Sequence, residues 1–262
     1  MENSPPRREL APHPVLPGHY SRAEDRVGYI RRLFDRTAES YDVINAWMSM
    51  NRGEQYRRDA MIRAGVTEGH RLLDCASGTG VMAAHAQSLV GANGEVIALD
   101  PSLPMLAVAA RRGVRSRVAG IAEQLPLPDA SVDMITMGYA LRHVADLGIA
   151  FTEFARVLRP SGRLLILEMV SPDSRRGYMF AKLYLKHLVP TLASLVTHSR
   201  DARRLMRYYW DTVDQCVPPA VVIGALKEAG FCEISRSAQF SLLNEYRAKI
   251  PAPRARAASL DA

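Results

Sequence analysis

A strand, a glycine turn and a second strand that ends in a carboxylate constrain this chain more than any other feature. Residues 72–80 read Leu-Leu-Asp-Cys-Ala-Ser-Gly-Thr-Gly, and a second apolar run over 96–99 ends at Asp100, which lies 20 residues after Gly80. The glycines let the backbone approach a ligand closely, and the helix that begins near Gly80 presents free N–H groups to it. A carboxylate at this spacing can accept both hydroxyls of a ribose. The pattern predicts a site for an adenosine-containing cofactor.

Two classes of cofactor use this arrangement, and one acidic residue separates them. Residues 78–83 fit the loose dinucleotide pattern G-x-G-x-x-G/A, with Ala83 in the last place. A pyrophosphate is doubly anionic, and Asp74, directly before the turn, would repel it. The same carboxylate would attract the amino group of a methionine-derived cofactor. Asp74, the two glycines and Asp100 therefore indicate a site for S-adenosylmethionine (SAM).

Short motifs along the rest of the chain point the same way. They are Phe34-Asp35, Tyr41-Asp42-Val43-Ile44-Asn45, Asp100-Pro101-Ser102-Leu103-Pro104-Met105-Leu106, Glu123–Asp129, Leu141-Arg142-His143-Val144, and Arg156–Gly162 with Leu165–Glu168. These segments resemble signatures of the UbiE family, the ubiquinone/menaquinone ring C-methyltransferases, which are class I methyltransferases. The resemblance covers roughly residues 27–235, and its family-specific part is 41–45 and Leu141-Arg142.

The motifs and the resemblance together imply which residues hold SAM. These are Asp74, Ala76, Gly78, Thr79, Gly80, Asp100, Pro101, Met105, Ile121, Ala122 and Gly138. Two of these SAM positions and one candidate catalytic position differ from the family pattern. Ile121 replaces a polar residue placed to meet the adenine, Gly138 replaces a serine, and His143 replaces the asparagine of the Arg-Asn pair. The family's C-terminal pattern is also replaced, by Phe240–Tyr246, which leaves the methyl acceptor open.

Strands and helices alternate along the chain, which predicts an α/β fold. We expect strands at 71–75, 95–99, 115–119, 132–137, 163–169, 231–237 and about 238–243. The resemblance implies a doubly wound, seven-stranded, mostly parallel sheet of the Rossmann-like class I methyltransferase type, with N-terminal helices. It also implies a helical insertion after strand five, over 174–211, within a single domain of residues 21–250. Proline-rich residues 1–20 and residues 251–262 are expected to be disordered tails.

Composition indicates a cytosolic enzyme. The chain shows no signal-peptide pattern, its most apolar segments are interrupted by charges, and its three cysteines are scattered without metal-ligand spacing, so no metal is expected. The net charge of +7 includes a basic cluster in the 174–211 insertion, beside an apolar stripe at helical spacing. This segment is equally consistent with a functional role and with a core stripe that has a solvated face. The functional role would be a peripheral contact to an anionic membrane or a lid over a lipophilic substrate. Nucleic acid is not expected as a partner, because aromatic residues do not interleave with the basic ones.

The chemistry follows from what ring methylation requires. A ring carbon becomes electron-rich when a ring hydroxyl is ionised, so a base and a group that holds the oxyanion are needed. We expect His143 to be the base and Arg142 to hold the oxyanion. Tyr41, Asp42 and Asn45 are further candidates near the methyl group, although Asp42 and Asn45 are equally plausible as anchors for the N-terminal segment.

The predicted function is SAM-dependent C-methylation of an aromatic or quinol-like, lipophilic ring. One alternative is a methyltransferase that acts on O or N of a small secondary metabolite or a lipid headgroup. Another is a non-catalytic SAM-binding subunit of a biosynthetic complex, against which Tyr41, Asn45 and Arg142 argue. The sequence does not specify the oligomeric state.

Overall fold

The computed structural model describes residues 9–48, 52–239 and 242–253. The helices of the described residues are α1 (Asp25–Met48), α2 (Gly53–Ala64), α3 (Val81–Val90), α4 (Leu103–Arg111), the 3₁₀ helix η1 (Leu141–His143), α5 (Leu147–Val157), α6 (Arg175–Ala181), the π-helix η2 (Lys182–Leu188), α7 (Val189–Thr197), α8 (Arg200–Asp214) and α9 (Pro219–Glu228). The strands are β1 (Arg71–Cys75), β2 (Glu95–Asp100), β3 (Ser116–Ala119), β4 (Val132–Gly138), β5 (Leu158–Met169), β6 (Cys232–Gln239) and β7 (Leu243–Lys249).

The strands form one seven-stranded sheet in the order β3-β2-β1-β4-β5-β7-β6. The first five strands are parallel, and β7 runs antiparallel to both of its neighbours. The chain crosses outward from β1 in one direction and then in the other, so the predicted doubly wound, mostly parallel sheet is confirmed.

The last strand was predicted in the wrong place. It was expected at about 238–243, whereas β7 covers Leu243–Lys249. Polar residues such as Asn244 and Glu245 do not indicate a buried strand in the sequence. In the structure this strand lies between β5 and β6, and their side chains are buried together with that of Tyr246. Residues 240 and 241, which belong to the same prediction, lie outside the described residues.

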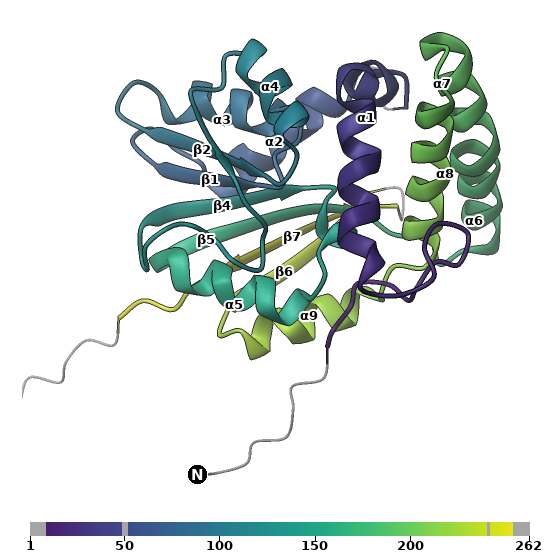
Figure 1. Ribbon diagram of the computed structural model, residues 1–262. Helices are drawn as coiled ribbons and strands as arrows, with labels where there is room; N and C mark the ends of the chain where they lie inside the picture. Colours follow the sequence, from purple (N-terminus) through teal and green to yellow (C-terminus); the bar gives the residue numbers. More distant parts are fainter. Residues whose placement is uncertain (1–8, 49–51, 240–241, 254–262) are drawn as a thin grey trace, which may run out of the picture.

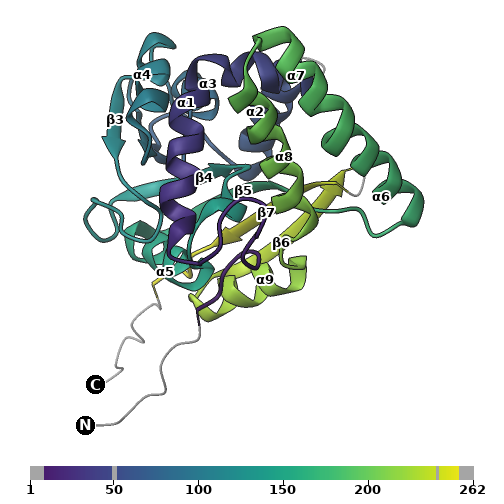
Figure 2. The same ribbon diagram turned by 45° about the vertical axis from the view of Figure 1, so that its right-hand side comes forward.

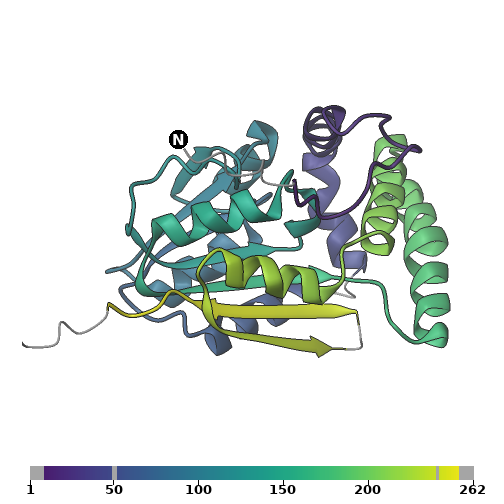
Figure 3. The ribbon, with the colours of Figure 1, turned by 90° about the horizontal axis from the view of Figure 1, so that it is seen from below.

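Helices cover both faces of the sheet and also its carboxyl edge (Figure 1). Helices α2 and α3 pack on one face, and α5 and α9 on the other (Figure 3). A separate apolar cluster joins α1 to η2, α7 and α8, which stand at the carboxyl ends of the strands (Figure 2). The helical insertion predicted over 174–211 is therefore present as α6, η2, α7 and most of α8.

Residues 9–20 are not a disordered tail, as was expected, but pack against the domain. The Leu10 N–H donates to Asp146 Oδ2 at 2.9 Å, and the Leu147 N–H donates to the Leu10 carbonyl at 3.0 Å. Leu16 and Tyr20 are buried among α1 and α8. The prediction of disorder rested on the prolines and did not consider these apolar side chains. Their burial offsets the conformational entropy that is lost when the segment becomes ordered. Residues 251–253 of the other expected tail are exposed and form no helix or strand, and residues 1–8 and 254–262 lie outside the described residues.

Candidate active site

A cavity of about 560 Å³ opens at the carboxyl ends of β1, β2 and β4, beneath α1. Its lining combines the glycine turn, the end of β2, the loop after β3, the segment after β4 and one side of α1. Eight of the predicted cofactor residues line it: Ala76, Gly78, Asp100, Pro101, Met105, Ile121, Ala122 and Gly138. Ligand sites of open α/β sheets occur at this edge, where the strand order reverses.

The glycine turn and the β2 carboxylate form one unit. Gly78 adopts φ 57°, and a Cβ placed there would meet no atom within 4 Å, so the turn presents bare backbone to the cavity. Asp100 accepts the Gly78 N–H through Oδ2 and the Ser102 N–H through Oδ1, each at 2.8 Å. Burial raises the pKa of Asp100 to about 6, against the effect of these two bonds. A carboxylate oxygen that already accepts one bond can accept another, so Asp100 remains available to a ligand.

Asp74, Thr79 and Gly80 lie behind the turn and do not line the cavity. Asp74 is buried and accepts from Ser77 Oγ and Thr136 Oγ1, both at 2.7 Å. Gly80 adopts φ 77°, and a Cβ there would lie 2.8 Å from Ala109 Cβ. These three predicted cofactor residues therefore hold the shape of the turn.

Three acidic residues on one face of α1 dock this helix over the cofactor end of the cavity. Asp35 accepts from Ser102 Oγ at 2.6 Å, and Glu39 pairs with Arg111 at 2.6 Å. Asp42 accepts from Thr79 Oγ1 and from Arg112 Nη2, both at 2.5 Å. Asp42 was expected among the catalytic candidates, but both of its oxygens accept bonds from these protein groups and the residue does not line the cavity. Asn45, the other residue with an anchoring alternative, is partly buried and does not line the cavity.

An aromatic wall lines part of the cavity and consists of Phe34, Tyr41, Tyr139 and His143. The ring of Phe34 meets those of Tyr41 and His143 edge to face, with centroids 5.8 and 5.3 Å apart. Tyr139 adopts φ 61°, an uncommon conformation for a bulky residue. Such a wall suits a flat, apolar ring.

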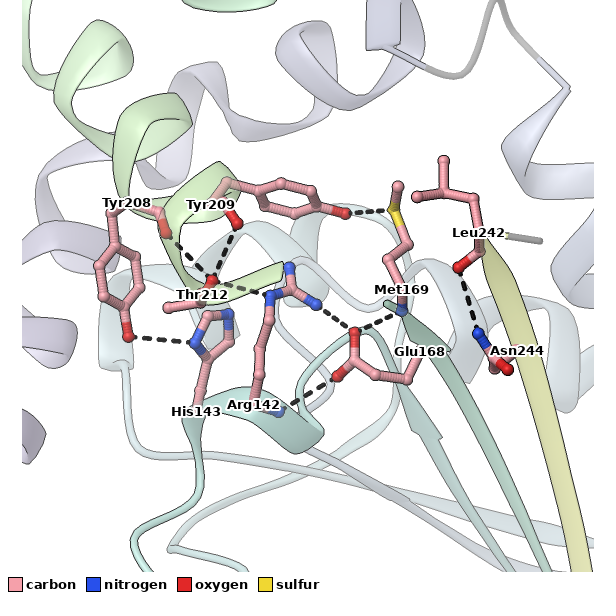
Figure 4. A network of polar contacts seen from close by, with 9 residues as sticks. All are labelled: Arg142, His143, Glu168, Met169, Tyr208, Tyr209, Thr212, Leu242 and Asn244. Atoms are coloured by element: carbon pink, nitrogen blue, oxygen red, sulfur yellow. Dashed lines mark hydrogen bonds and ion pairs between the residues drawn. The ribbon is translucent and has the colours of Figure 1, made fainter. Parts of the chain in front are cut away.

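His143 is the polar group of the aromatic wall that is suited to accept a proton. Its Nδ1 lies 3.3 Å from the Tyr208 hydroxyl, and the Tyr208 ring stacks on it with centroids 5.5 Å apart (Figure 4). Burial, together with the charge of Arg142, holds the pKa of His143 well below its usual value of 6.5. The imidazole is therefore neutral at pH 7 and keeps a lone pair.

Arg142 does not reach the cavity, contrary to the expectation that it holds a substrate oxygen. Its side chain is fully buried beneath His143 and forms an ion pair with Glu168. Its Nε donates to Thr212 Oγ1 at 3.1 Å, and its guanidinium carbon lies 4.1 Å from the centroid of the Tyr209 ring (Figure 4). Both side chains reach α8, where His143 contacts Tyr208 and Arg142 contacts Thr212 one turn further along, but only His143 also lines the cavity (Figure 4).

Sequence reasoning missed three residues that shape the site. Phe34 and Ser102 stand inside recognised motifs, so their positions were visible but their contacts were not. Tyr139 follows Gly138 directly, yet no local pattern shows that its ring faces the cavity. These contacts depend on how α1 crosses the sheet, which short-range patterns do not encode.

Known proteins resemble this chain in sequence and in fold. The ubiquinone/menaquinone biosynthesis C-methyltransferase UbiE of Cellvibrio japonicus is 32% identical over 79% of this chain and 85% of its own length. The demethylmenaquinone methyltransferase of Symbiobacterium thermophilum is 34% identical over 80% of this chain and 87% of its own length. A solved SAM-dependent methyltransferase of Thermotoga maritima, described as a possible histamine N-methyltransferase, shares the fold with a TM-score of 0.60 at 19% identity, covering 84% of this chain and 98% of that one. The family description "ubiE/COQ5 methyltransferase family" matches residues 21–240. The chain therefore belongs to the ubiE/COQ5 methyltransferase family.

Proposed function

We propose that this SAM-dependent methyltransferase transfers a methyl group to a ring carbon of a lipophilic quinol, the reaction that its relatives' names indicate. One observation carries the proposal. A single cavity joins a ribose-type carboxylate, Asp100, to an aromatic wall that contains a neutral imidazole, His143. The first of these suits the adenosine of the methyl donor, and the second suits a hydroxylated ring.

The described residues fit SAM. Asp100 would accept the ribose hydroxyls, the bare turn at Gly78 leaves room for close approach, and Met105, Ile121 and Ala122 offer an apolar slot for the adenine. When bound, SAM supplies an electrophilic methyl group on sulfur. The protein contributes the positioning of two reactants in a site that α1 screens from water, which can account for much of the rate.

His143 acts on the acceptor hydroxyl. When Nδ1 carries the ring proton and donates to Tyr208, the lone pair of Nε2 is free for the substrate. A phenolic hydroxyl has a pKa near 10 and that of His143 lies below 6.5, so complete proton transfer costs about 5 kcal/mol or more. One turnover per second corresponds to a barrier of roughly 17 kcal/mol, so the cost of proton transfer is well below the total barrier of such a reaction. His143 therefore accepts the hydroxyl hydrogen bond or proton, which increases the negative charge on the hydroxyl oxygen of the acceptor while its ring carbon attacks the methyl group.

The acceptor chemistry is tested with a short-chain demethylmenaquinone, supplied either oxidised or chemically reduced, together with radiolabelled SAM. Only the reduced quinol has the hydroxyl that His143 needs, so label should enter the reduced acceptor alone. Equal labelling of both forms, or labelling only of amines or of lipid headgroups, would contradict the proposal and favour the alternative acceptors. SAM binding without transfer to any acceptor would favour a non-catalytic subunit.

We also propose that the protein works in the cytosol at the surface of an anionic membrane, which its insertion contacts. No helix of the described residues is long and apolar enough to cross a bilayer. On α6 and η2, however, Phe180 is 72% exposed and Leu183 64% exposed, beside Lys182 and Lys186. Residues 174–200 contain no Asp or Glu. Exposed apolar side chains flanked by cations are typical of helices that lie in a membrane interface.

Liposome sedimentation tests this contact. Binding to anionic vesicles should fall as salt is added, because the Debye length shortens from ~10 Å at 0.1 M to ~3 Å at 1 M. Lys182→Glu and Lys186→Glu should each weaken it and together abolish it, whereas the single reversal Lys227→Glu on α9, on another face, should leave it unchanged. Binding that is absent even at low salt would contradict the contact.

A further inference from the structure

Arg57 is a cation close to the site that has no ion-pair partner among the described residues. It lies on α2 and is partly buried, with its guanidinium carbon 4.8 Å from the centroid of the Tyr139 ring. Among the described residues it forms no hydrogen bond and no ion pair. Its counterparts nearby are paired, since Arg112 contacts Asp42 at 2.5 Å and Arg63 contacts Glu245 at 2.8 Å. A partly desolvated guanidinium without a carboxylate is costly unless a ligand supplies one.

The surroundings of Arg57 place it beside the end of the cavity that faces β4. Tyr139, on which it stacks, lines the cavity and directly follows β4. Asp74, at the end of β1, feels the charge of Arg57, which together with hydrogen bonds from Ser77 and Thr136 opposes the effect of burial on its pKa. Asp74 accepts one bond from each of those hydroxyls and forms no ion pair with Arg57, so the attraction between the two charges acts without direct contact.

The sheet order gives the cavity two ends. β1 lies between β2 and β4, so Asp100 and the Gly138–Tyr139 segment stand on opposite sides of the glycine turn. The adenosine of the methyl donor belongs with Asp100, and its amino-acid portion, which ends in an α-carboxylate, belongs toward β4. A guanidinium matches a carboxylate with two parallel N–H bonds.

We infer that Arg57 binds the α-carboxylate of the methionine moiety of SAM, with the Tyr139 ring holding its guanidinium in place. The pairing supplies a counter-ion that the described residues do not provide, and it fixes the amino-acid end of the donor. Tyr139 then serves both reactants, because one face of its ring supports Arg57 while the residue also lines the cavity.

The test measures binding alone and needs no acceptor, so it stands apart from the quinol proposal. Calorimetry compares SAM with decarboxylated SAM, which lacks only the carboxylate, on the wild type and on Arg57→Gln. The wild type should bind SAM about ten- to hundred-fold more tightly than decarboxylated SAM, as expected for a charge-assisted bond. In Arg57→Gln that preference should disappear, with SAM weakened and decarboxylated SAM unchanged. Arg58→Gln, the exposed neighbour on the same helix, should behave like the wild type.

Two outcomes would overturn the assignment. One is a wild type that binds both compounds equally, a result that requires no variant and is independent of how Arg57→Gln folds. The other is an Arg57→Gln protein that loses affinity for both compounds alike, since this would indicate that Arg57 only supports Tyr139. Arg57→Lys should retain part of the preference for SAM, because it keeps the charge but not the two-pronged geometry.

Discussion

Arg142 and Glu168 form an ion pair that is fully buried directly beneath the aromatic wall of the cavity. Glu168 also accepts the Arg142 N–H through Oε2 at 3.1 Å and the Met169 N–H through Oε1 at 2.7 Å. The pair thus ties η1 to the end of β5, and the bond from Arg142 to Thr212 extends the tie to α8. Its function is to hold the turn that presents His143.

Breaking this pair on one side should destabilise the protein strongly. Glu168→Gln leaves an uncompensated buried guanidinium, so we expect the free energy of unfolding to fall by about 3–5 kcal/mol in urea titrations. Arg142→Met with Glu168→Met removes both charges and should cost less than the single change. Lys249→Met breaks the exposed pair with Glu233 and should cost less than about 1 kcal/mol. A single change at Glu168 as mild as Lys249→Met would refute this role.

Asp100 should make cofactor binding depend on pH. Its pKa is raised to about 6, chiefly by burial, and only the ionised form accepts both ribose hydroxyls. SAM affinity should therefore rise as the pH increases through about 6 and level off above it. Asp100→Asn should lower affinity by about ten- to hundred-fold at pH 7.5 and flatten this pH dependence, measured by calorimetry. An unchanged affinity would remove Asp100 from the site.

His143 should affect turnover but not cofactor binding. His143→Ala should lower kcat by about 10²–10⁴-fold with SAM affinity nearly unchanged. His143→Asn, which restores the family residue, should keep more activity than His143→Ala. Because the pKa of His143 lies well below 6.5, the acidic fall in wild-type kcat should begin only at a correspondingly low pH and should vanish in His143→Asn. Near-normal turnover of His143→Ala would move the search for the base to Tyr41.

His13 should make the folded state acid-sensitive. It is 1% exposed, its Nδ1 donates to the Pro14 carbonyl at 2.7 Å, and Arg26 and Arg142 are the cations near it. Its pKa is lowered from 6.5 to about 4, mainly by burial. Between these pH values the ring is therefore protonated in the unfolded chain and neutral in the folded chain. The contribution of His13 to stability should fall as the pH drops from about 6.5 toward 4 and should be constant above that range. Asp74 and Asp100, whose pKa values burial raises to about 6, act in the opposite direction over the same range.

Urea midpoints at pH 7 and pH 5 provide the measurement for this acid sensitivity. His13→Gln keeps a donor for the carbonyl without a titrating ring, so lowering the pH from 7 to 5 should destabilise this variant less than the wild type. The exposed residue His198, changed to Asn, serves as the control and should leave the wild-type pH dependence intact. Equal pH dependence in His13→Gln and the wild type would show that other groups carry the effect.

The cofactor end of the site could be predicted because its contacts are local. Gly78 and Asp100 form a hydrogen bond within one strand–helix–strand unit, and a short continuous stretch of sequence shows the pattern of that unit. The family motifs added His143 and Tyr41, which line the same cavity. These predictions needed no knowledge of how distant segments cross.

The remaining features depend on long-range packing that a local pattern does not show. Arg142 looked like a binding residue, but only the positions of Glu168 and Thr212 reveal that it is enclosed. The polar residues of β7 are buried because this strand lies between β5 and β6, and residues 9–20 pack against α8 and α5. Neither arrangement could be predicted from the local sequence. Arg57 gained its significance because no carboxylate in the described part of the chain pairs with it, which no sequence pattern reports.

The most direct measurement of the proposed reaction locates the transferred methyl group. The protein is incubated with SAM that carries a trideuterated methyl group and a reduced short-chain demethylmenaquinol, and the product is analysed by mass spectrometry and NMR. The label should appear on a ring carbon, with both hydroxyls free, and His143→Ala should reduce its yield in proportion to kcat. Label on a hydroxyl oxygen, or a product free of label while SAM is bound, would contradict ring C-methylation.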